Sequence, residues 1–187
     1  MLDKILQLDA ELFLAINHGW VCKFLDFLMP ILTDKSGALI LIAILVLFAI
    51  FGGKKGRIMA IFALVAVGFA DLISAQFMKP FFGRIRPCHD LPARMLANCS
   101  SSNSFPSSHA SNIFAFAISV GYSYRWALIG LLPLAFGVAL SRVYVGVHYP
   151  IDITVGALLG TFLGLFFGYI AKLIYGPKKV KIDKDNN

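Results

Sequence analysis

The chain has 187 residues, of which 58% are hydrophobic and only 14% are charged. A soluble domain of this length carries more charge and less aliphatic bulk, so the composition excludes an ordinary soluble protein and indicates an integral membrane protein. The formal net charge of +7 does not indicate nucleic-acid binding, because the basic residues are dispersed over connections between apolar runs.

The first segment places apolar side chains at helical spacing. They are Leu2, Ile5, Leu6, Leu12, Phe13 and Ile16, with Asp3, Lys4, Gln7, Asp9 and Glu11 between them. This pattern predicts an amphipathic helix that lies flat in the membrane interface rather than crossing it. Residues 21–32 contain Lys23, Asp26 and Pro30, which predicts a second interfacial or re-entrant segment. A sixth span is the alternative.

Five runs that are nearly free of charge follow. They are Gly37–Phe51, Ile58–Met78, Ala110–Tyr124, Trp126–Leu140 and Ile153–Ile174. The second and fifth reach the roughly 20 residues that cross a bilayer, and the others need flanking polar residues to complete their helices. The sequence therefore predicts an all-α, polytopic transmembrane bundle of about five spans. We expect one integral-membrane domain in residues 1–176, with residues 1–32 as its interfacial segment, and a disordered basic cytoplasmic tail in residues 177–187.

The connections predict which side of the membrane each segment faces. Alternating spans put the "GGKKGR" stretch, Arg125 and the lysine-rich tail on one face, which the positive-inside rule makes cytoplasmic. The loop between the second and third spans then lies outside. Its Cys88 and Cys99 could form a disulfide in an oxidising compartment, and free thiols are the alternative. We expect no metal site beside His89, because no second ligand pair has zinc-like spacing.

Three polar segments fall on that outer side. The first, "KPFFGRIRP", follows the second span, and Pro80 predicts that the helix ends at Met78 or Lys79. Its cations, Lys79, Arg84 and Arg86, then emerge at the membrane surface. Taken alone, they could simply be snorkelling residues that anchor a helix end.

The second segment, "FPSSHASN", opens the third span. Ser107 is placed to cap the helix, and the free N–H groups and dipole at a helix start also favour an anion. His109 then lies in the first turn, beside any anion that binds there. The alternative is a plain cap followed by a surface histidine.

The third segment, "SRVYVGVHYPID", connects the last two spans. His148 and Asp152 are four residues apart, which predicts that they share a helix face. Pro150 is tolerated only in a first turn, so the helix is expected to begin near His148. A carboxylate that accepts from one imidazole nitrogen makes the other more nucleophilic. A lone pair of this kind is more often structural.

Together the segments describe a phosphate site. Cations and helix-terminal amides bind the phosphate, one histidine attacks phosphorus and the other protonates the leaving oxygen. The patterns Lys79-x6-Arg86-Pro87, Pro106-Ser107-Ser108-His109 and Ser141-Arg142-x5-His148-x3-Asp152 resemble the type 2 phosphatidic acid phosphatase superfamily. This superfamily includes membrane lipid phosphatases and shares its site with vanadium haloperoxidases.

The resemblance implies a role for each residue. Lys79, Arg86 and Arg142 would bind the phosphate oxygens, together with Ser107 and the backbone N–H of Ser108. His148 would be the nucleophile that forms a phosphohistidine, Asp152 would orient it, and His109 would be the general acid. The family needs no metal or other cofactor. Ser108 replaces the glycine that is usual in the second motif, and because its amide is retained we expect activity to survive.

The resemblance also implies a function at the outer face of a bacterial inner membrane. There the chain would hydrolyse a lipid phosphomonoester or pyrophosphate, and in its overall character it is most similar to the bacterial lipid A 1-phosphatase branch. Undecaprenyl-diphosphate phosphatase and phosphatidylglycerophosphate phosphatase are the alternatives. The expected partners are the lipid substrate and membrane lipids, without nucleic acid or a protein partner.

A lipid or ion transporter is the alternative from a different class. Asp71, inside the second predicted span, favours it, because an intramembrane aspartate is a functional candidate. We prefer the interpretation that Asp71 hydrogen-bonds to a neighbouring helix.

Overall fold

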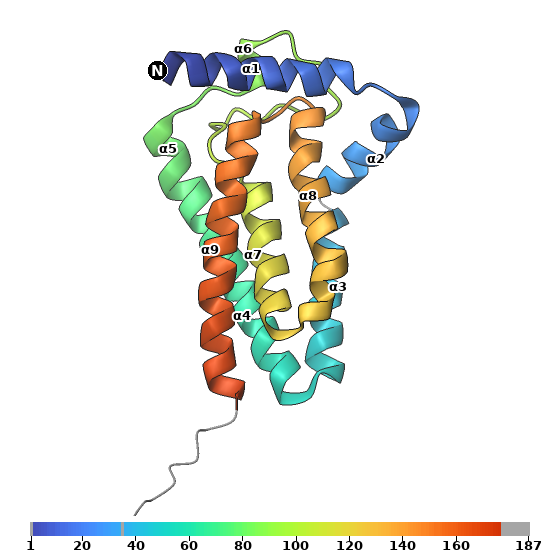
Figure 1. Ribbon diagram of the computed structural model, residues 1–187, viewed down its shortest axis with the longest axis vertical. Helices are drawn as coiled ribbons and strands as arrows, with labels where there is room; N and C mark the ends of the chain where they lie inside the picture. The colour runs from blue at the N-terminus through green and yellow to red at the C-terminus, as the bar shows by residue number, and fades with distance from the viewer. Residues whose placement is uncertain (1, 35, 177–187) are drawn as a thin grey trace, which may run out of the picture.

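The computed structural model describes residues 2–34 and 36–176, and across them the chain is helical, with no β-strand (Figure 1). This confirms the all-α fold class. The predicted disordered tail, residues 177–187, lies outside the described residues.

The apolar runs form helices that lie lengthwise in the bundle (Figure 1). They are α3 (Ser36–Phe51), α4 (Gly53–Leu72), α7 (Ser108–Ser123), α8 (Leu128–Tyr144) and α9 (Pro150–Tyr175), with a short 3-10 turn, η2 (Arg125–Ala127), before α8. By length and apolar character, the described residues contain three candidate membrane spans, or up to four if the bent pair of N-terminal helices counts as one. Because α3 and α7 have only 16 residues each, the five-span count stays a prediction.

Helix α7 occupies the centre of the bundle and packs against α4, α8 and α9. Most of its side chains are buried, and Ile113, Phe116 and Val120 belong to the main hydrophobic core. Met59 from α4 and Leu131 from α8 join the same core. Because α7 is buried on most of its surface and contacts three other helices, it is the axis on which the bundle is assembled.

A row of glycines brings α9 unusually close to α7. Gly156, Gly160, Gly164 and Gly168 recur at every fourth position and face α7. A Cβ atom at Gly156 would lie 2.5 Å from the Ser107 carbonyl oxygen, and one at Gly164 would lie 2.8 Å from that of Ala115. Small residues at this spacing let two backbones touch, as in other membrane helix pairs. This glycine seam, Gly156 to Gly168, fixes the position of the start of α9 relative to the start of α7 along the bundle.

The N-terminal helix α1 (Leu2–Gly19) lies across one end of the bundle (Figure 1). A bend of 119° separates it from α2 (Lys23–Thr33). This arrangement agrees with the interfacial segment expected from the sequence, and it adds a contact face that the apolar pattern did not indicate. The face that packs on the bundle is Asp9, Phe13 and Asn17, all buried, whereas Leu6 and Leu12 are exposed. The reason is that the polar side chains find hydrogen-bond partners in the bundle, so α1 can leave aliphatic side chains for the bilayer surface.

The end of the second run also differs from the prediction. Helix α4 continues through a π-helical segment, η1 (Ile73–Met78), into α5 (Lys79–Phe82), one turn beyond the expected end. Pro80 lies in the first turn that follows the wider π segment, where its missing N–H costs little. The helix ends instead at Gly83, whose positive φ of 60° suits a left-handed cap.

Candidate active site

The three polar segments meet at the end of the bundle that α1 covers (Figure 1). The backbone N–H of Ser107 donates to the Asp152 carbonyl, with an N···O distance of 3.0 Å. Arg86 Nη1 lies 3.1 Å from His148 Nε2. The prediction that all three segments share one face is therefore confirmed, and the contacts between them are direct.

His148 and Asp152 contact each other, although not as two residues on one helix face. Helix α9 begins at Pro150, so His148 precedes it. The Asp152 carboxylate turns back to accept from the Tyr149 N–H at 2.9 Å, and the same oxygen lies 3.3 Å from His148 Nδ1. A carboxylate only accepts, so the imidazole proton lies on Nδ1 and Nε2 keeps its lone pair.

Burial keeps this imidazole neutral. Both His148 and Asp152 are fully buried. Burial lowers the pKa of His148 to about 3, the hydrogen bond to Asp152 opposes that shift, and the nearby charge of Arg86 adds to it. At neutral pH Nε2 therefore carries no proton and keeps the lone pair that a nucleophile needs.

Arg86 lies in front of that lone pair and is held by backbone. Its Nε donates to the Ser102 carbonyl at 2.7 Å, and its Nη1 donates to the Val147 carbonyl at 2.9 Å. A planar guanidinium held this way presents its remaining N–H groups in a fixed direction. These contacts place a cation within reach of the oxygens that a phosphate on His148 would have.

Lys79 is the second buried cation of the site. Its Nζ donates to the Asn103 carbonyl at 2.7 Å, and the Asn103 amide donates to the Lys79 carbonyl at 2.9 Å. Ser104 adds a hydroxyl that donates to Asp152 Oδ2. These loop residues were not among the predicted site residues. The sequence signal that could have found them is the polar run "CSSSNS" immediately before the second motif.

The start of α7 forms a third wall of the site. Ser107 caps the helix, as predicted, and its Oγ accepts from the Ala110 N–H at 3.4 Å. The Ser108 hydroxyl accepts from Ser74 in η1 at 2.9 Å. His109 is exposed, and among the described residues no hydrogen bond engages its imidazole. The N–H groups of Ser108 and His109 lie in the first turn of α7, where no intrahelical acceptor exists for them, and this favours an anion at the helix start.

Arg142, near the end of α8, completes the set of cations. Its Nη1 donates to the Thr33 hydroxyl of α2, while its Nε is buried without a hydrogen-bond partner in the described part of the chain. Arg142, Lys79 and Arg86 all lie near enough to His109 for their charges to act on its imidazole. A buried donor without an acceptor is what a phosphate oxygen would satisfy.

Asp71, the residue that favoured a transporter, contacts a neighbouring helix. Asn112 of α7 donates to its Oδ1 at 3.0 Å. The contact agrees with the structural interpretation that we preferred for this residue.

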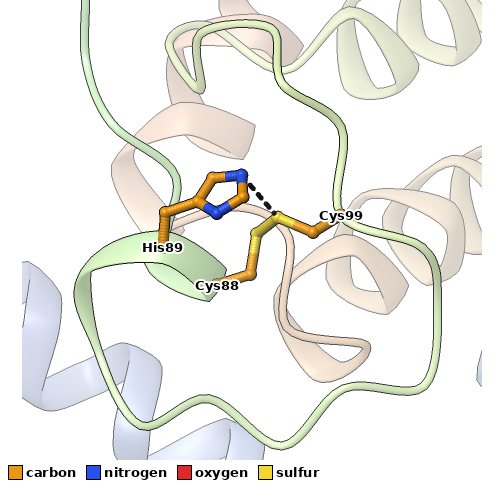
Figure 2. A group of neighbouring side chains, drawn as sticks. All are labelled: Cys88, His89 and Cys99. Atoms are coloured by element: carbon orange, nitrogen blue, oxygen red, sulfur yellow. Dashed lines mark hydrogen bonds between the residues drawn. A yellow bond between two sulfur atoms is a disulfide. The ribbon is translucent and has the colours of Figure 1, made fainter.

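Cys88 and Cys99 are joined by a disulfide, as the sequence allowed (Figure 2). Cys88 lies in the short helix α6 (Pro87–Asp90), and the bridge closes a ring of residues 88–99 that ends shortly before Ser102, Asn103 and Ser104. His89 Nε2 lies 3.2 Å from Cys99 Sγ, so the three side chains form a cluster of metal-ligand type. With both sulfurs in the disulfide, neither is the thiolate that a metal requires.

Known proteins resemble this chain in sequence and in structure. The PAP2 superfamily model matches residues 58–174. The lipid A 4'-phosphatase of Bacteroides thetaiotaomicron is 30% identical over 181 residues, which cover 91% of this chain and 80% of that protein. The undecaprenyl-diphosphatase of Sulfolobus acidocaldarius is 30% identical and covers 86% of this chain and 77% of its own. The crystal structure of Aquifex aeolicus LpxE superposes with a TM-score of 0.68 at 26% identity, covering 84% of this chain and 92% of that one.

Proposed function

Because the chain belongs to the PAP2 superfamily of membrane lipid phosphatases, we propose that it removes a phosphate group from lipid A through a phosphohistidine on His148. The reaction takes place at the outer face of the inner membrane and needs no metal ion. The observation that carries the proposal is the buried, neutral imidazole whose Nδ1 faces Asp152 and whose Nε2 faces Arg86.

The lipid A 4'-phosphatase relative supports lipid A as the substrate class. It aligns with 91% of this chain. The whole-chain character, a small core with an N-terminal interfacial helix, suggested the 1-phosphate. The 4'-phosphate is the position in the relative's name. An assay that reports the position of cleavage decides between them.

In the first chemical step, the His148 Nε2 lone pair attacks phosphorus and the bond from phosphorus to the lipid oxygen breaks. His109 begins as the protonated imidazolium and gives one proton to that leaving oxygen, so the lipid departs as an alcohol and His109 becomes neutral. Lys79, Arg86 and Arg142 surround the three phosphoryl oxygens, helped by Ser107 and the Ser108 amide. Their fixed positive charges stabilise the negative charge in the transition state without reorganisation.

In the second step, water attacks the phosphohistidine and the N–P bond breaks. His109, now neutral, accepts a proton from that water, so phosphate is released and both histidines return to their starting states. Asp152 stabilises the imidazolium that exists between the two steps, because its carboxylate lies against Nδ1.

Replacing the nucleophile tests this proposal. With purified protein in mixed micelles of bis-phosphorylated lipid A, we expect His148→Ala to lower phosphate release by at least about a thousandfold, because no other group can form the covalent intermediate. Mass spectrometry of the product gives the position of cleavage. His18→Ala changes an exposed histidine of α1 whose Nε2 lies 2.9 Å from the Pro92 carbonyl oxygen, and it serves as the control. A well-folded His148→Ala protein that retains more than about a tenth of the wild-type rate excludes His148 as nucleophile.

Undecaprenyl-diphosphate hydrolysis is the second candidate function. It is supported by the Sulfolobus relative, which aligns with 86% of the chain. Assaying lipid A and undecaprenyl diphosphate side by side gives a ratio of kcat/KM values that ranks the two substrates. If the purified protein releases phosphate from neither lipid nor from phosphatidylglycerophosphate, the phosphatase assignment fails and the transporter alternative regains support.

A further inference from the structure

A chain of charged groups links the N-terminal helix to the proposed catalytic aspartate. Arg84, in the loop after α5, donates from Nη1 to Asp152 Oδ1 at 2.8 Å and from Nη2 to Asp9 Oδ2 at 2.7 Å. Asp9 belongs to α1 and lies 75 residues away from Arg84 in the sequence. One guanidinium therefore joins a carboxylate of α1 to a carboxylate of α9.

The two oxygens of Asp152 have different partners. Oδ2 faces His148 Nδ1 and also accepts from the Tyr149 N–H and the Ser104 hydroxyl. Among the described residues, Oδ1 has one hydrogen-bond donor, which is Arg84. A carboxylate held at one oxygen can still rotate, so the bond to Arg84 fixes the plane in which Oδ2 meets the imidazole.

Arg84 is itself held from two sides. Its guanidinium carbon lies 3.9 Å from the centre of the Tyr149 ring, in a cation–π contact. Asp9 accepts one of its N–H groups and, through its other oxygen, accepts the Ile151 N–H in the first turn of α9 at 2.9 Å. Asp9 therefore fixes both the guanidinium and the start of the helix that carries Asp152.

Helix packing alone does not explain why a buried position of α1 carries an aspartate. Asp9 is 1% exposed, whereas Leu6 and Leu12 on the same helix are 42% and 47% exposed. Burial raises the pKa of Asp9, and the Ile151 amide and Arg84 oppose that shift. Burying a carboxylate costs free energy that its partners offset only when the geometry is good, and an apolar residue would dock α1 without that cost.

We propose that Asp9 and Arg84 are positioning residues, which hold Asp152 in the orientation that aligns the His148 imidazole, so that docking of α1 completes the active site. Neither residue touches the substrate. The proposal rests on the proposed role of His148 as nucleophile. It assigns the N-terminal helix a part in catalysis that the three motifs do not contain.

A graded series at Asp9 tests the proposal with the same lipid A micelle assay. Asp9→Ala removes both acceptors, and we expect kcat to fall about 100-fold, as expected when reacting groups are misplaced by about 1 Å. Asp9→Asn keeps one carbonyl oxygen and can satisfy one of the two donors, so a fall of about tenfold is expected. KM should change less than about threefold for both, because the phosphate-binding cations are untouched.

Arg84→Lys is the complementary variant. One ammonium cannot reproduce the two-pronged bridge between two carboxylates, so we expect a fall in kcat of about tenfold to 100-fold. Combined with Asp9→Ala, it should lower kcat little further, because both changes break the same link.

Asp26→Ala is the matched control. Asp26 also pairs an arginine to an N-terminal helix, with Arg94 Nη2 at 2.6 Å, but it has no contact with Asp152. We expect its kcat to stay within about twofold of wild type, even if unfolding temperature falls as much as in Asp9→Ala.

The outcomes separate this proposal from the one on which it rests. Wild-type activity with an inactive His148→Ala, but with kcat of Asp9→Ala within twofold of wild type, overturns the positioning role and leaves the proposed function intact. Equal losses in Asp9→Ala and Asp26→Ala also overturn it, because they indicate general destabilisation. If Asp9→Ala does not fold, Asp9→Asn and Arg84→Lys decide by the same criterion. Lack of phosphate release by the wild-type protein refutes the proposed function itself.

Discussion

The seam between α7 and α9 and the outer loop, residues 83–107, both position the candidate site, but by different physical means. At the seam, backbones touch because glycines leave no side chain between them. In the loop, little regular structure is present beyond α6, and backbone carbonyls of Ser102 and Asn103 accept from Arg86 and Lys79.

The difference matches what each region must do. The seam sets the start of α7 against the start of α9, so the distance between the anion-binding helix end and the His148 segment is fixed by steric contact. The loop accepts hydrogen bonds from Arg86 and Lys79 and so holds these two cations beside the place where a phosphate would bind. We infer that the seam supplies geometry and the loop supplies binding, which makes the two regions separable by mutation.

The largest effect is expected at the seam. A Cβ at Gly160 would overlap the carbonyl of Ser111, so Gly160→Ala must push α9 away from α7. Overpacking of this kind costs about 1–3 kcal/mol of unfolding free energy. A shift near 1 Å between reacting groups lowers kcat about 100-fold. Thermal unfolding of the purified variant measures the loss of stability, and steady-state kinetics measure the loss of kcat.

Gly68→Ala is the control for that change. Gly68 lies on the exposed side of α4, and a Cβ there would have no atom within 4 Å. The same substitution should leave kcat unchanged, and in a helix interior alanine is favoured over glycine by up to about 1 kcal/mol. Equal behaviour of the two variants would show that the seam does not set the geometry of the site.

The sequence predicted which polar segments come together better than it predicted the residues that support them. The three motifs identified eight residues that the structure gathers at one end of the bundle, because span counting alone puts their segments on one side. Arg84 was seen in the sequence but interpreted as a membrane-surface cation, and Asp9 was assigned to the polar pattern of an interfacial helix. Their partners lie 68 and 75 residues away, and no local periodicity reports a contact of that kind.

The close packing of α7 with α9 and the contact between His148 and Asp152 both have a signal in the sequence, but a less specific one than the motifs. The spacing Gly156-x3-Gly160-x3-Gly164 is readable and could have predicted the close helix pair. The contact between His148 and Asp152 was predicted correctly but for the wrong reason, since the carboxylate reaches back from the first turn of α9 to cap it. Capping and helix-face geometry bring residues four apart together equally well, so the spacing alone does not distinguish them.

A smaller effect is expected in the loop. Replacing Cys88 and Cys99 with serine removes a bridge that closes a short ring, worth about 2–3 kcal/mol by loop-closure entropy. We expect KM to rise by up to about tenfold while kcat changes less, because the loop holds the cations and not the nucleophile. Steady-state kinetics on lipid A micelles separate the two parameters.

Cys22→Ser provides the control for the loop variant, because Cys22 is an exposed free thiol in the connection before α2. Treating the wild-type protein with a reductant should reproduce the serine variant, and reductant should not affect the variant itself. A fall in kcat at constant KM would show that the loop, like the seam, sets the geometry of the reacting groups. The proposed division between a binding loop and a geometric seam would then be wrong.

The smallest effect, no change at all, is expected from a chelator. In the described residues, the one group of side chains suited to a metal is Cys88, His89 and Cys99 in the loop (Figure 2). If the disulfide braces the loop and Lys79, Arg86 and Arg142 supply the positive charge at the phosphate, then excess EDTA should leave kcat and KM unchanged. Vanadate should still inhibit under the same conditions, because it mimics the transferring phosphoryl group.

Two results would contradict the chelator prediction, and they point to different parts of the molecule. A rise in KM with EDTA, reversed by zinc and abolished in His89→Ala, would mean that the loop is braced by a metal on reduced cysteines. A loss of kcat reversed by magnesium would mean that a metal supplies charge at the reacting phosphate. Thiol quantification of the same denatured protein sample distinguishes the cases. With the disulfide intact, one thiol, that of Cys22, reacts, whereas with a metal bound to reduced cysteines all three thiols react.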